Sequence, residues 1–472
     1  MRAILRLSPF CLVAACTGAP SDRGPAPSAV PSQPVAATTA GVHPAEAPAD
    51  VILVLEDGLR SDIGGPGAEA ALFDALAAAA PGHPPLLRYT NASAQSVQAF
   101  LSIGSILTGR YPSAVPICSL PVGPKVTSTP WCVQIPASVP TIPGFLSIYG
   151  YSTALVVTPP SLREHDQIAG EFGAVFVSRD SEHDGLGSAV DNSLAWWTKS
   201  SGTPRFLMIV DDLAAPVMLG APSQLAPGEV DTVVPKLRAA YSEGAAARGK
   251  ELGRLLVAAS AGTTRETWMI VTAAHGVSIG ETTGTPSLPI APVQHDILLE
   301  RTLHVPLAIF GPASAGSPLV VPEVRELTDI APTIAHLGRA LPPAGLTGRD
   351  LFETAPPTTE RVAYAEFGDM LAGRSQRYLL MARLWMHGGT ALDPEITRKL
   401  RDRPSPGSTF TLHDIVADPM QTTNLVSTDP KDAATMYDAL LALRTGPAAP
   451  PQGGLTQDQV AKLRSSGALN YW

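Results

Sequence analysis

The sequence predicts an α/β fold in which helices cover both faces of a layered sheet. From residue 51 onward, short apolar segments typical of buried strands alternate with segments of helical spacing, which is the pattern of helices packed on a sheet. Apolar residues make up 45% of the 472 residues, enough for a large hydrophobic core. From about residue 358, short strand-like pieces precede a single helix. We therefore expect a smaller α+β subdomain at the C-terminal end.

The first strand and the first helix carry the clearest signals. Residues 51–56 read Val-Ile-Leu-Val-Leu-Glu, a nearly continuous apolar run expected for a parallel strand that is buried on both faces. The spacing of apolar residues predicts a helix over 96–108, with Ser96 as its N-cap and Gly109 at its C-terminal end. Further strands are predicted at 153–157, 205–210, 267–272 and 305–310, and further helices near 187–199, 235–260 and 327–338. In the C-terminal subdomain the predicted strands are 361–367, 378–384 and 409–413, followed by a helix near 429–444.

Residues 1–16 have the features of a secretion signal. A cationic start precedes an apolar stretch, Leu7–Ala15, that is too short to span a bilayer. The segment Val13–Cys16 resembles a bacterial lipobox, in which small residues precede a cysteine that becomes lipidated; an ordinary cleaved signal is the alternative. We therefore expect a lipoprotein signal peptide, with Cys16 as the lipidation site. The resemblance places the protein in the bacterial cell envelope, lipid-anchored on the periplasmic or outer surface.

Residues 17–50 are dominated by Pro, Ala, Ser and Thr and lack apolar periodicity, so they are predicted to be a tether. At about 3.1 Å per residue, a polyproline-like chain of this length reaches roughly 100 Å. Later in the sequence, no apolar stretch approaches the length that spans a bilayer. We expect the mature protein to be anchored to the membrane and not to span it.

The charge balance and the cysteines narrow the functional classes further. Lys and Arg number 33 against 42 Asp and Glu, for a formal net charge of -9, which excludes a dedicated nucleic-acid binder. Of the four cysteines, Cys11 would leave with the signal and Cys16 would be acylated. The remaining pair, Cys118 and Cys132, is predicted to form a disulfide outside the cytoplasm, with two buried free thiols as the alternative.

Seven segments that follow one another along the chain carry a family resemblance. They are 51–62, 105–112, 150–155, 269–276, 305–307, 329–333 and 412–425. Together they resemble segments of the sulfatases of the alkaline phosphatase superfamily. The resemblance implies a sulfatase-like domain over 51–355, built on an alkaline-phosphatase/sulfatase-like mixed sheet sandwiched by helices. It implies a C-terminal subdomain over 356–472.

The same resemblance indicates where catalytic groups should lie. In active sulfatases, a cysteine or serine at a helix N-terminus is converted to formylglycine and acts as the nucleophile. Ala99 takes this position here, and alanine has no atom that can serve as a nucleophile. Ser102 matches the serine of the family motif and His295 the place of a later Lys or His, so these two are the remaining catalytic candidates. The cationic loops of the family correspond to Thr158–Pro160 and Ala214–Pro216, which contain no cationic residue.

The family also binds a divalent cation, and half of its expected ligands are missing. Asp57 and His275 keep two of the four positions, whereas Gly58 and Ala274 occupy the other two. Ca²⁺ and Mg²⁺ require several oxygen ligands, so one carboxylate and one imidazole form a remnant site for Ca²⁺ or Mg²⁺ and at most a partial Zn²⁺ site. In the alternative interpretation, Asp57 caps the turn after the first strand and His275 is an ordinary loop histidine.

These departures lead to one leading hypothesis and two alternatives. The leading hypothesis is a catalytically degenerate sulfatase-like lipoprotein that retains a binding or scaffolding role, with a sulfated or phosphorylated glycan or small molecule as ligand. The first alternative is an active metal-dependent hydrolase of sulfate or phosphate esters that uses Ser102 or a metal-bound water. The second is a purely structural envelope lipoprotein.

Overall fold

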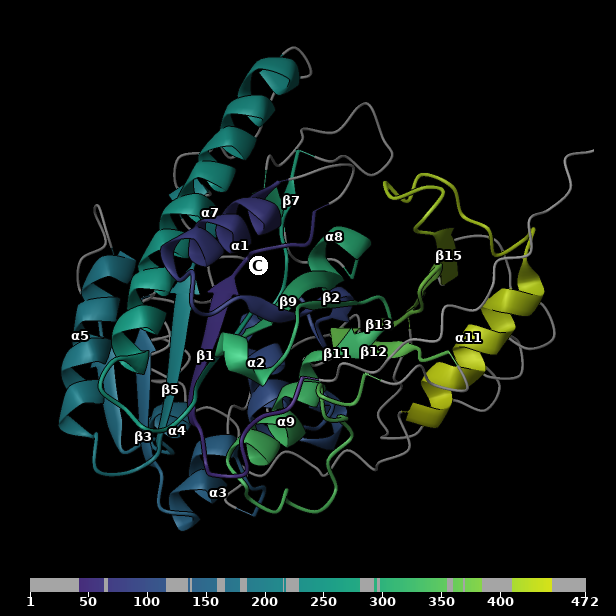
Figure 1. Ribbon diagram of the computed structural model, residues 1–472. Coiled ribbons are helices and arrows are strands. Elements are labelled where there is room, and N and C mark those ends of the chain that lie inside the picture. Colours follow the sequence, from purple (N-terminus) through teal and green to yellow (C-terminus); the bar gives the residue numbers. More distant parts are fainter. Residues whose placement is uncertain are drawn as a thin grey trace, which may run out of the picture. The chain divides into compact units, whose positions relative to one another are not determined.

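A nine-stranded mixed sheet is the largest element of the protein (Figure 1). The computed structural model describes residues 42–62, 67–115, 135, 138–158, 166–178, 185–214, 216–217, 229–280, 293–294, 298–354, 360–367, 370–383 and 410–443. All of them belong to one unit, Ala40–Trp472. The strands are β1 (Asp50–Asp57), β2 (Pro85–Ser93), β3 (Ser152–Val157), β4 (Ala174–Val177), β5 (Arg205–Asp212), β6 (Thr267–Thr272), β9 (His304–Phe310), β10 (Leu319–Val321) and β11 (Arg325–Glu326).

The strand order is β10-β2-β9-β6-β1-β5-β3-β4, and β11 also pairs with β2. All of these pairs are parallel except those of β9, which runs against both β6 and β2. The apolar run Val51–Leu55 is fully buried, as expected for a strand in the middle of a parallel sheet that is covered on both faces. The mixed α/β fold and the five strands predicted for this sheet are confirmed, whereas β2, β4, β10 and β11 were not predicted.

Helices cover both faces of this sheet. They are α1 (Ala68–Ala79), α2 (Ala99–Thr108), α3 (Ile142–Ile148), α4 (Asp166–Ala169), α5 (Gly185–Lys199), α7 (Val230–Ser260), α8 (Glu300–Leu303) and α9 (Ile330–Leu337). Figure 1 shows α1, α5 and α7 on one face and α2, α3 and α9 on the other. None of the helices formed by the described residues combines the length and the hydrophobicity that a bilayer-spanning helix requires.

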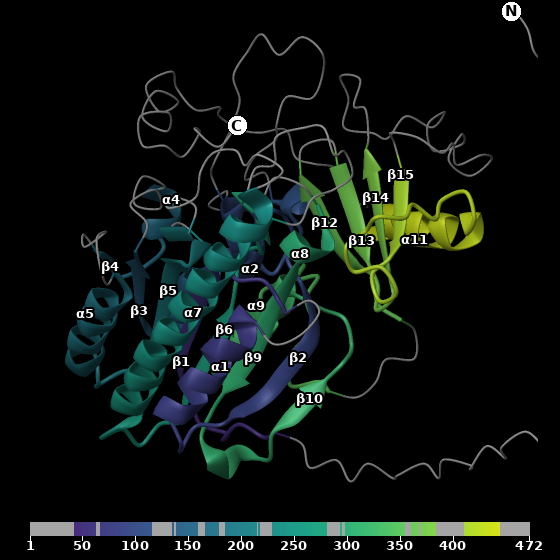
Figure 2. The ribbon, with the colours of Figure 1, turned by 90° about the horizontal axis from the view of Figure 1, so that it is seen from above.

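The smaller subdomain is an antiparallel sheet with one helix packed against it (Figure 2). It contains β12 (Ala363–Phe367), β13 (Met370–Arg374), β14 (Tyr378–Arg383), β15 (Phe410–Asp414) and α11 (Pro430–Leu443). Leu371, Leu380 and Leu412 share a buried cluster with Leu440 of α11 and with Tyr111, which follows α2. This cluster therefore joins the subdomain to the main sheet. A two-stranded pair, β7 (Ser278–Ile279) with β8 (Val293–Gln294), completes the described strands.

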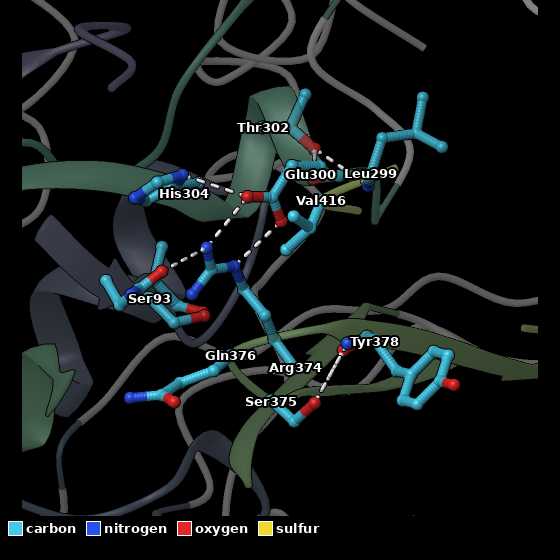
Figure 3. Close-up of polar contacts among 12 residues, drawn as sticks. Ser93, Leu299, Glu300, Thr302, His304, Arg374, Ser375, Gln376, Tyr378 and Val416 are labelled. Carbon is cyan, nitrogen blue, oxygen red and sulfur yellow. Dashed lines mark hydrogen bonds and ion pairs between the residues drawn. The ribbon is translucent and has the colours of Figure 1, made fainter. Parts of the chain in front are cut away.

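A buried ion pair joins β13 of the smaller sheet to α8 of the main part (Figure 3). The Nε and Nη2 groups of Arg374 donate to the two carboxylate oxygens of Glu300, both at 2.7 Å. The same guanidinium donates to Asn91 Oδ1 at 3.1 Å, and His304 Nδ1 lies 2.9 Å from Glu300 Oε1. Glu300 and Arg374 are both almost completely buried, so this pair fixes the contact between the two sheets.

A second buried network also joins the main part to the smaller subdomain. Arg361 Nη1 and Nη2 donate to the two carboxylate oxygens of Asp329 at 2.6 and 2.9 Å. Arg361 Nη2 also lies 2.5 Å from Glu326 Oε2, which accepts a hydrogen bond from the Tyr111 hydroxyl at 3.0 Å. Glu326 and Asp329 have no exposed surface. One cation therefore holds two carboxylates of the main part against the start of the smaller sheet.

Candidate functional site

The candidate metal ligands meet at the carboxyl edge of the sheet. Asp57 is the last residue of β1, and His275 lies just after β6, the strand that pairs with β1. Since the carboxyl ends of parallel strands meet at one edge, and ligands of α/β sheets bind there, the two side chains come together. His275 Nε2 lies 3.4 Å from Asp57 Oδ1.

The protonation state of His275 decides what this contact can do. The Nδ1 group lies 2.9 Å from the carbonyl oxygen of Gly276, so the bonded tautomer carries its proton on Nδ1. In the neutral ring, the Nε2 lone pair then faces the Asp57 carboxylate. Burial lowers the pKa of His275, although the Gly276 carbonyl and Asp212 act in the opposite direction. A neutral imidazole and a carboxylate that face each other offer two electron-pair donors, which can act as ligands of a cation.

Two ligand groups are too few for the divalent-cation site that the family resemblance implies. Ca²⁺ takes about six to eight oxygen ligands, and Mg²⁺ needs near-octahedral coordination. Among the described residues, no group of three or more His, Cys, Asp or Glu side chains is arranged to hold a metal ion. The described side chains therefore do not fit the divalent cation that the family resemblance implies, and whether any cation binds stays a prediction.

At Gly58, the backbone conformation as well as the residue type disfavours a metal-binding side chain. Gly58 has a φ of 76°, in the left-handed region that residues other than glycine rarely adopt. A Cβ added there would lie 2.4 Å from the Cβ of Ala214, in the loop after β5. At the other changed position, Ala274 is completely buried. Neither position can regain a carboxylate without movement of its neighbours.

The position expected for the nucleophile is the first residue of α2. Ala99 begins this helix after Gln98, which makes no side-chain capping hydrogen bond. The prediction that Ser96 is the N-cap is wrong. Its hydroxyl accepts a hydrogen bond from the Gln98 backbone N–H at 3.3 Å, which forms a turn before the helix and leaves the cap to the next residues.

Ser102 lies inside the first turns of the same helix and is completely buried. Its hydroxyl accepts from the Ser96 backbone N–H at 3.1 Å and donates to the Ser96 carbonyl oxygen at 3.0 Å. Both hydrogen-bonding functions of this side chain thus tie the incoming loop to the helix. The other catalytic candidate, His295, lies outside the described residues, as do Cys16, Cys118 and Cys132.

A charged cluster at the same edge was missed by the sequence reasoning. The side chains of Glu56 and Asp211, opposite each other on β1 and β5, share the guanidinium of Arg248 from α7. Arg248 Nε lies 2.5 Å from Asp211 Oδ2 and 3.3 Å from Glu56 Oε2. The hydroxyl of Thr158, in a loop that corresponds to one of the family's cationic loops, donates a hydrogen bond to Asp211.

The electrostatics of this cluster follow from its depth. Glu56 is completely buried, and burial together with the negative charge of Asp211 raises its pKa well above the ordinary value, against the attraction of Arg248. The signal that could have revealed the cluster is the acidic residue at the end of each apolar strand, Glu56 and Asp211. Its cation, on a helix far along the chain, leaves no local pattern.

Comparisons with known proteins agree on the fold. The phosphonate monoester hydrolase of Agrobacterium radiobacter is 15% identical, with a TM-score of 0.61 over 84% of this chain and 95% of its own. The enzyme from Silicibacter pomeroyi of the same description is 16% identical, with a TM-score of 0.60 and coverages of 84% and 95%. A putative sulfatase from Bacteroides thetaiotaomicron is 16% identical, with a TM-score of 0.59 and coverages of 84% and 92%.

These similarities establish that the chain has the fold of sulfatases and phosphonate monoester hydrolases. The predicted resemblance is therefore confirmed at the level of the fold. No protein-family model matches the sequence, and no curated protein matches it either. Function must be argued from the site, because one fold supports many activities.

Proposed function

We propose that this protein is a catalytically degenerate sulfatase-like lipoprotein, which binds a sulfated or phosphorylated ligand at the carboxyl edge of its sheet and does not hydrolyse it. The observation that carries the proposal is Ala99 at the first residue of α2. Acyl, sulfuryl and phosphoryl transfer through a covalent intermediate all need a nucleophilic atom at that point, and a methyl group supplies none.

Binding of an anion is still compatible with this edge. α2 has neither a side-chain cap nor an acidic residue in its first turn. The N–H groups at a helix start have no partner within the helix and, with the helix dipole, favour a negatively charged group. A sulfate or phosphate oxygen is an acceptor of this kind, so ligand recognition can outlast the loss of the nucleophile.

The lipid anchor is the second part of the proposal. It is supported by the sequence Val13-Ala14-Ala15-Cys16 at the end of a short apolar stretch. Mass spectrometry of the purified protein, after expression in a bacterium that processes lipoproteins, should find Cys16 as the N-terminal residue with attached acyl chains. An N-terminus at another residue without acyl chains would reject the anchor and leave the ligand-binding proposal intact.

Hydrolysis is tested directly on the purified protein. We expect no turnover of 4-nitrophenyl sulfate, 4-nitrophenyl phosphate or a phosphonate monoester above the level of the Asp57→Ala, His275→Ala double variant. The assay is run with Ca²⁺, Mg²⁺, Mn²⁺ and Zn²⁺ in turn. Turnover that disappears in the double variant would overturn the proposal and favour an active metal-dependent hydrolase, for which the Asp57–His275 contact is the supporting observation.

Ligand binding is tested with heparin as the sulfated probe. If the start of α2 receives the anion, Ala99→Asp should weaken binding about tenfold, because it places a negative charge at the anion site. The matched control is Ala114→Asp, which makes the same charge change at an exposed residue beyond the helix. Equal effects of the two changes, or no binding at all, would favour a purely structural envelope protein.

A further inference from the structure

Three exposed apolar or aromatic residues lie in two neighbouring segments of the chain. Ile148, the last residue of α3, is 84% exposed, and Tyr149 after it is 45% exposed. Leu341, in the segment after α9, is 81% exposed. The backbone N–H of Leu341 donates to the Tyr149 hydroxyl at 3.1 Å, which holds the two segments side by side. These three residues are called the apolar patch below.

The apolar patch lies at the amino edge of the sheet, opposite the candidate site. Tyr149 precedes β3, and the backbone at Leu337, near Leu341, accepts a hydrogen bond from Ala49 just before β1. In Figure 1, α3 lies beyond the tails of β1 and β3, whereas the arrowheads point the other way. Asp57 and His275 follow the arrowheads.

The chain also enters the described unit beside this patch. Arg339, two residues before Leu341, donates to the carbonyl oxygens of Pro44 and Ala45. These residues lie near the start of the described chain, which begins at residue 42. The expected lipidation site, Cys16, is therefore joined to the body of the protein next to the patch, through residues 17–41.

We propose that the apolar patch is a membrane-contacting surface, which rests on the lipid bilayer that holds the anchor and turns the candidate site toward the aqueous side. The proposal rests on the lipid anchor of the proposed function. Two aliphatic side chains with a neighbouring tyrosine match the boundary between acyl chains and headgroups, where aliphatic groups insert and tyrosine lies at the interface.

A bilayer fits the size of the patch better than a second copy of the chain does. A stable protein–protein interface takes about 20–30 residues from each side, whereas the patch consists of three. A contact this small is weak on its own. A tether raises the effective concentration of the second contact to about the millimolar range, so a weakly inserting surface becomes populated once the anchor is in the membrane.

The experiment compares fluorophore positions on the full-length acylated protein in vesicles of phosphatidylethanolamine and phosphatidylglycerol. An environment-sensitive label is attached to Ile148→Cys or Leu341→Cys. The control is Val416→Cys, which replaces a 68% exposed aliphatic residue that follows β15 in the smaller subdomain. The parent protein, labelled in the same way, gives the background from its other cysteines. All three changed side chains are exposed, so the fold should tolerate them.

We expect a blue shift at positions 148 and 341 and quenching by spin-labelled lipid that is at least threefold stronger than at position 416. Equal, weak quenching at all three positions of vesicle-bound protein would overturn the membrane contact and leave the anchor intact. Protein that stays in solution with an unmodified Cys16 would reject the anchor and this proposal together. A blue shift without vesicles that grows with protein concentration would instead identify a second copy as the occupant, and overturn the proposal.

Discussion

The two polar regions of this protein differ in the kind of group that faces their carboxylates. In the networks between the sheets, Arg361 and Arg374 each meet buried carboxylates in two-point contacts. At the carboxyl edge, Asp57 faces a histidine whose pKa is lowered by burial. In the first region the carboxylates face guanidinium groups, whereas in the second region Asp57 faces an imidazole.

This difference teaches that the scaffold and the chemistry of a fold are maintained by separate groups. Removing one member of a buried ion pair costs stability at once, because a charge is left without a partner in a medium of low polarity. Replacing a nucleophile or a metal ligand by alanine or glycine leaves no buried charge behind. Substitutions at a catalytic edge can therefore accumulate in a protein that still folds.

The largest expected effect is that of Arg361→Met. The change leaves Glu326 and Asp329 buried without their cation, so we expect a loss of about 3–5 kcal/mol in the free energy of unfolding. Urea denaturation, monitored by tryptophan fluorescence, measures this loss of stability. The control is Arg377→Met, whose guanidinium pairs with Asp414 from an exposed position and should not shift the midpoint. Equal midpoints for the two variants would contradict the role given to the network.

Glu300→Gln should have the next largest effect, about 2–3 kcal/mol, because the single amide oxygen can accept only one of the two hydrogen bonds from buried Arg374, which also loses its counter-charge. Burial raises the pKa of Glu300, but Arg374 and His304 outweigh it, so the net pKa lies below the ordinary value of 4.5. A carboxylate with a lowered folded-state pKa stabilises the protein above its unfolded-state pKa. That contribution is lost as the pH falls below about 4.5 toward the folded-state pKa.

The measurement is the free energy of unfolding between pH 3 and pH 7. The wild-type protein should lose stability steeply below about pH 4.5, and Glu300→Gln should show a shallower slope in the same range. Glu46→Gln, which neutralises an exposed carboxylate near the start of the described chain, is the control. If both variants keep the wild-type slope, Glu300 does not carry the acid sensitivity.

Gly58→Ala tests whether a side chain fits at the position that the family resemblance assigns to a second metal ligand. A side chain at this left-handed backbone costs about 1 kcal/mol, and the approach to Ala214 adds about as much, for a total of about 2 kcal/mol. Gly262→Ala is the matched control, since Gly262 has a similar φ of 69° with nothing within 4 Å of an added Cβ. Gly262→Ala should lower the free energy of unfolding only by the backbone contribution of about 1 kcal/mol. Equal losses would mean that Ala214 does not close the position.

The sequence predicted the fold well where one segment carried the whole signal. The strand at 51–56 is a continuous apolar run, and its burial matches that pattern. By contrast, β2 reads Pro-Leu-Leu-Arg-Tyr-Thr-Asn-Ala-Ser, in which charged and polar residues break the run. The reversed direction of β9 depends on pairing with β6 and β2, which no local pattern reveals.

The same distinction holds for the candidate site. Asp57 and His275 were found because they lie in two of the segments that carry the family resemblance, 51–62 and 269–276, and chain topology places them at one edge. Arg248 could not be assigned to Glu56, because the ion pair joins a helix to a strand that is distant in the sequence. The cap at Ser96 was predicted wrongly because serine favours both helix caps and the turns before them, and the choice depends on Ser102 one turn later.

The smallest expected effect is that of Asp57→Asn, and it tests the comparison most directly. The side-chain oxygen of asparagine can still accept the hydrogen bond from the Gly58 backbone N–H, which Asp57 Oδ1 accepts at 3.0 Å. Because His275 is neutral, the change removes no attraction between opposite charges. We expect a change within about 0.5 kcal/mol. Asp329→Asn makes the same chemical change in the Arg361 network, where it should cost about 2 kcal/mol because a charged hydrogen bond is weakened. If Asp57→Asn were as destabilising as Asp329→Asn, the carboxyl edge would depend on the charge of Asp57 as much as the buried network depends on that of Asp329. A similar loss on chelator treatment of the wild-type protein would then identify a bound cation as the cause.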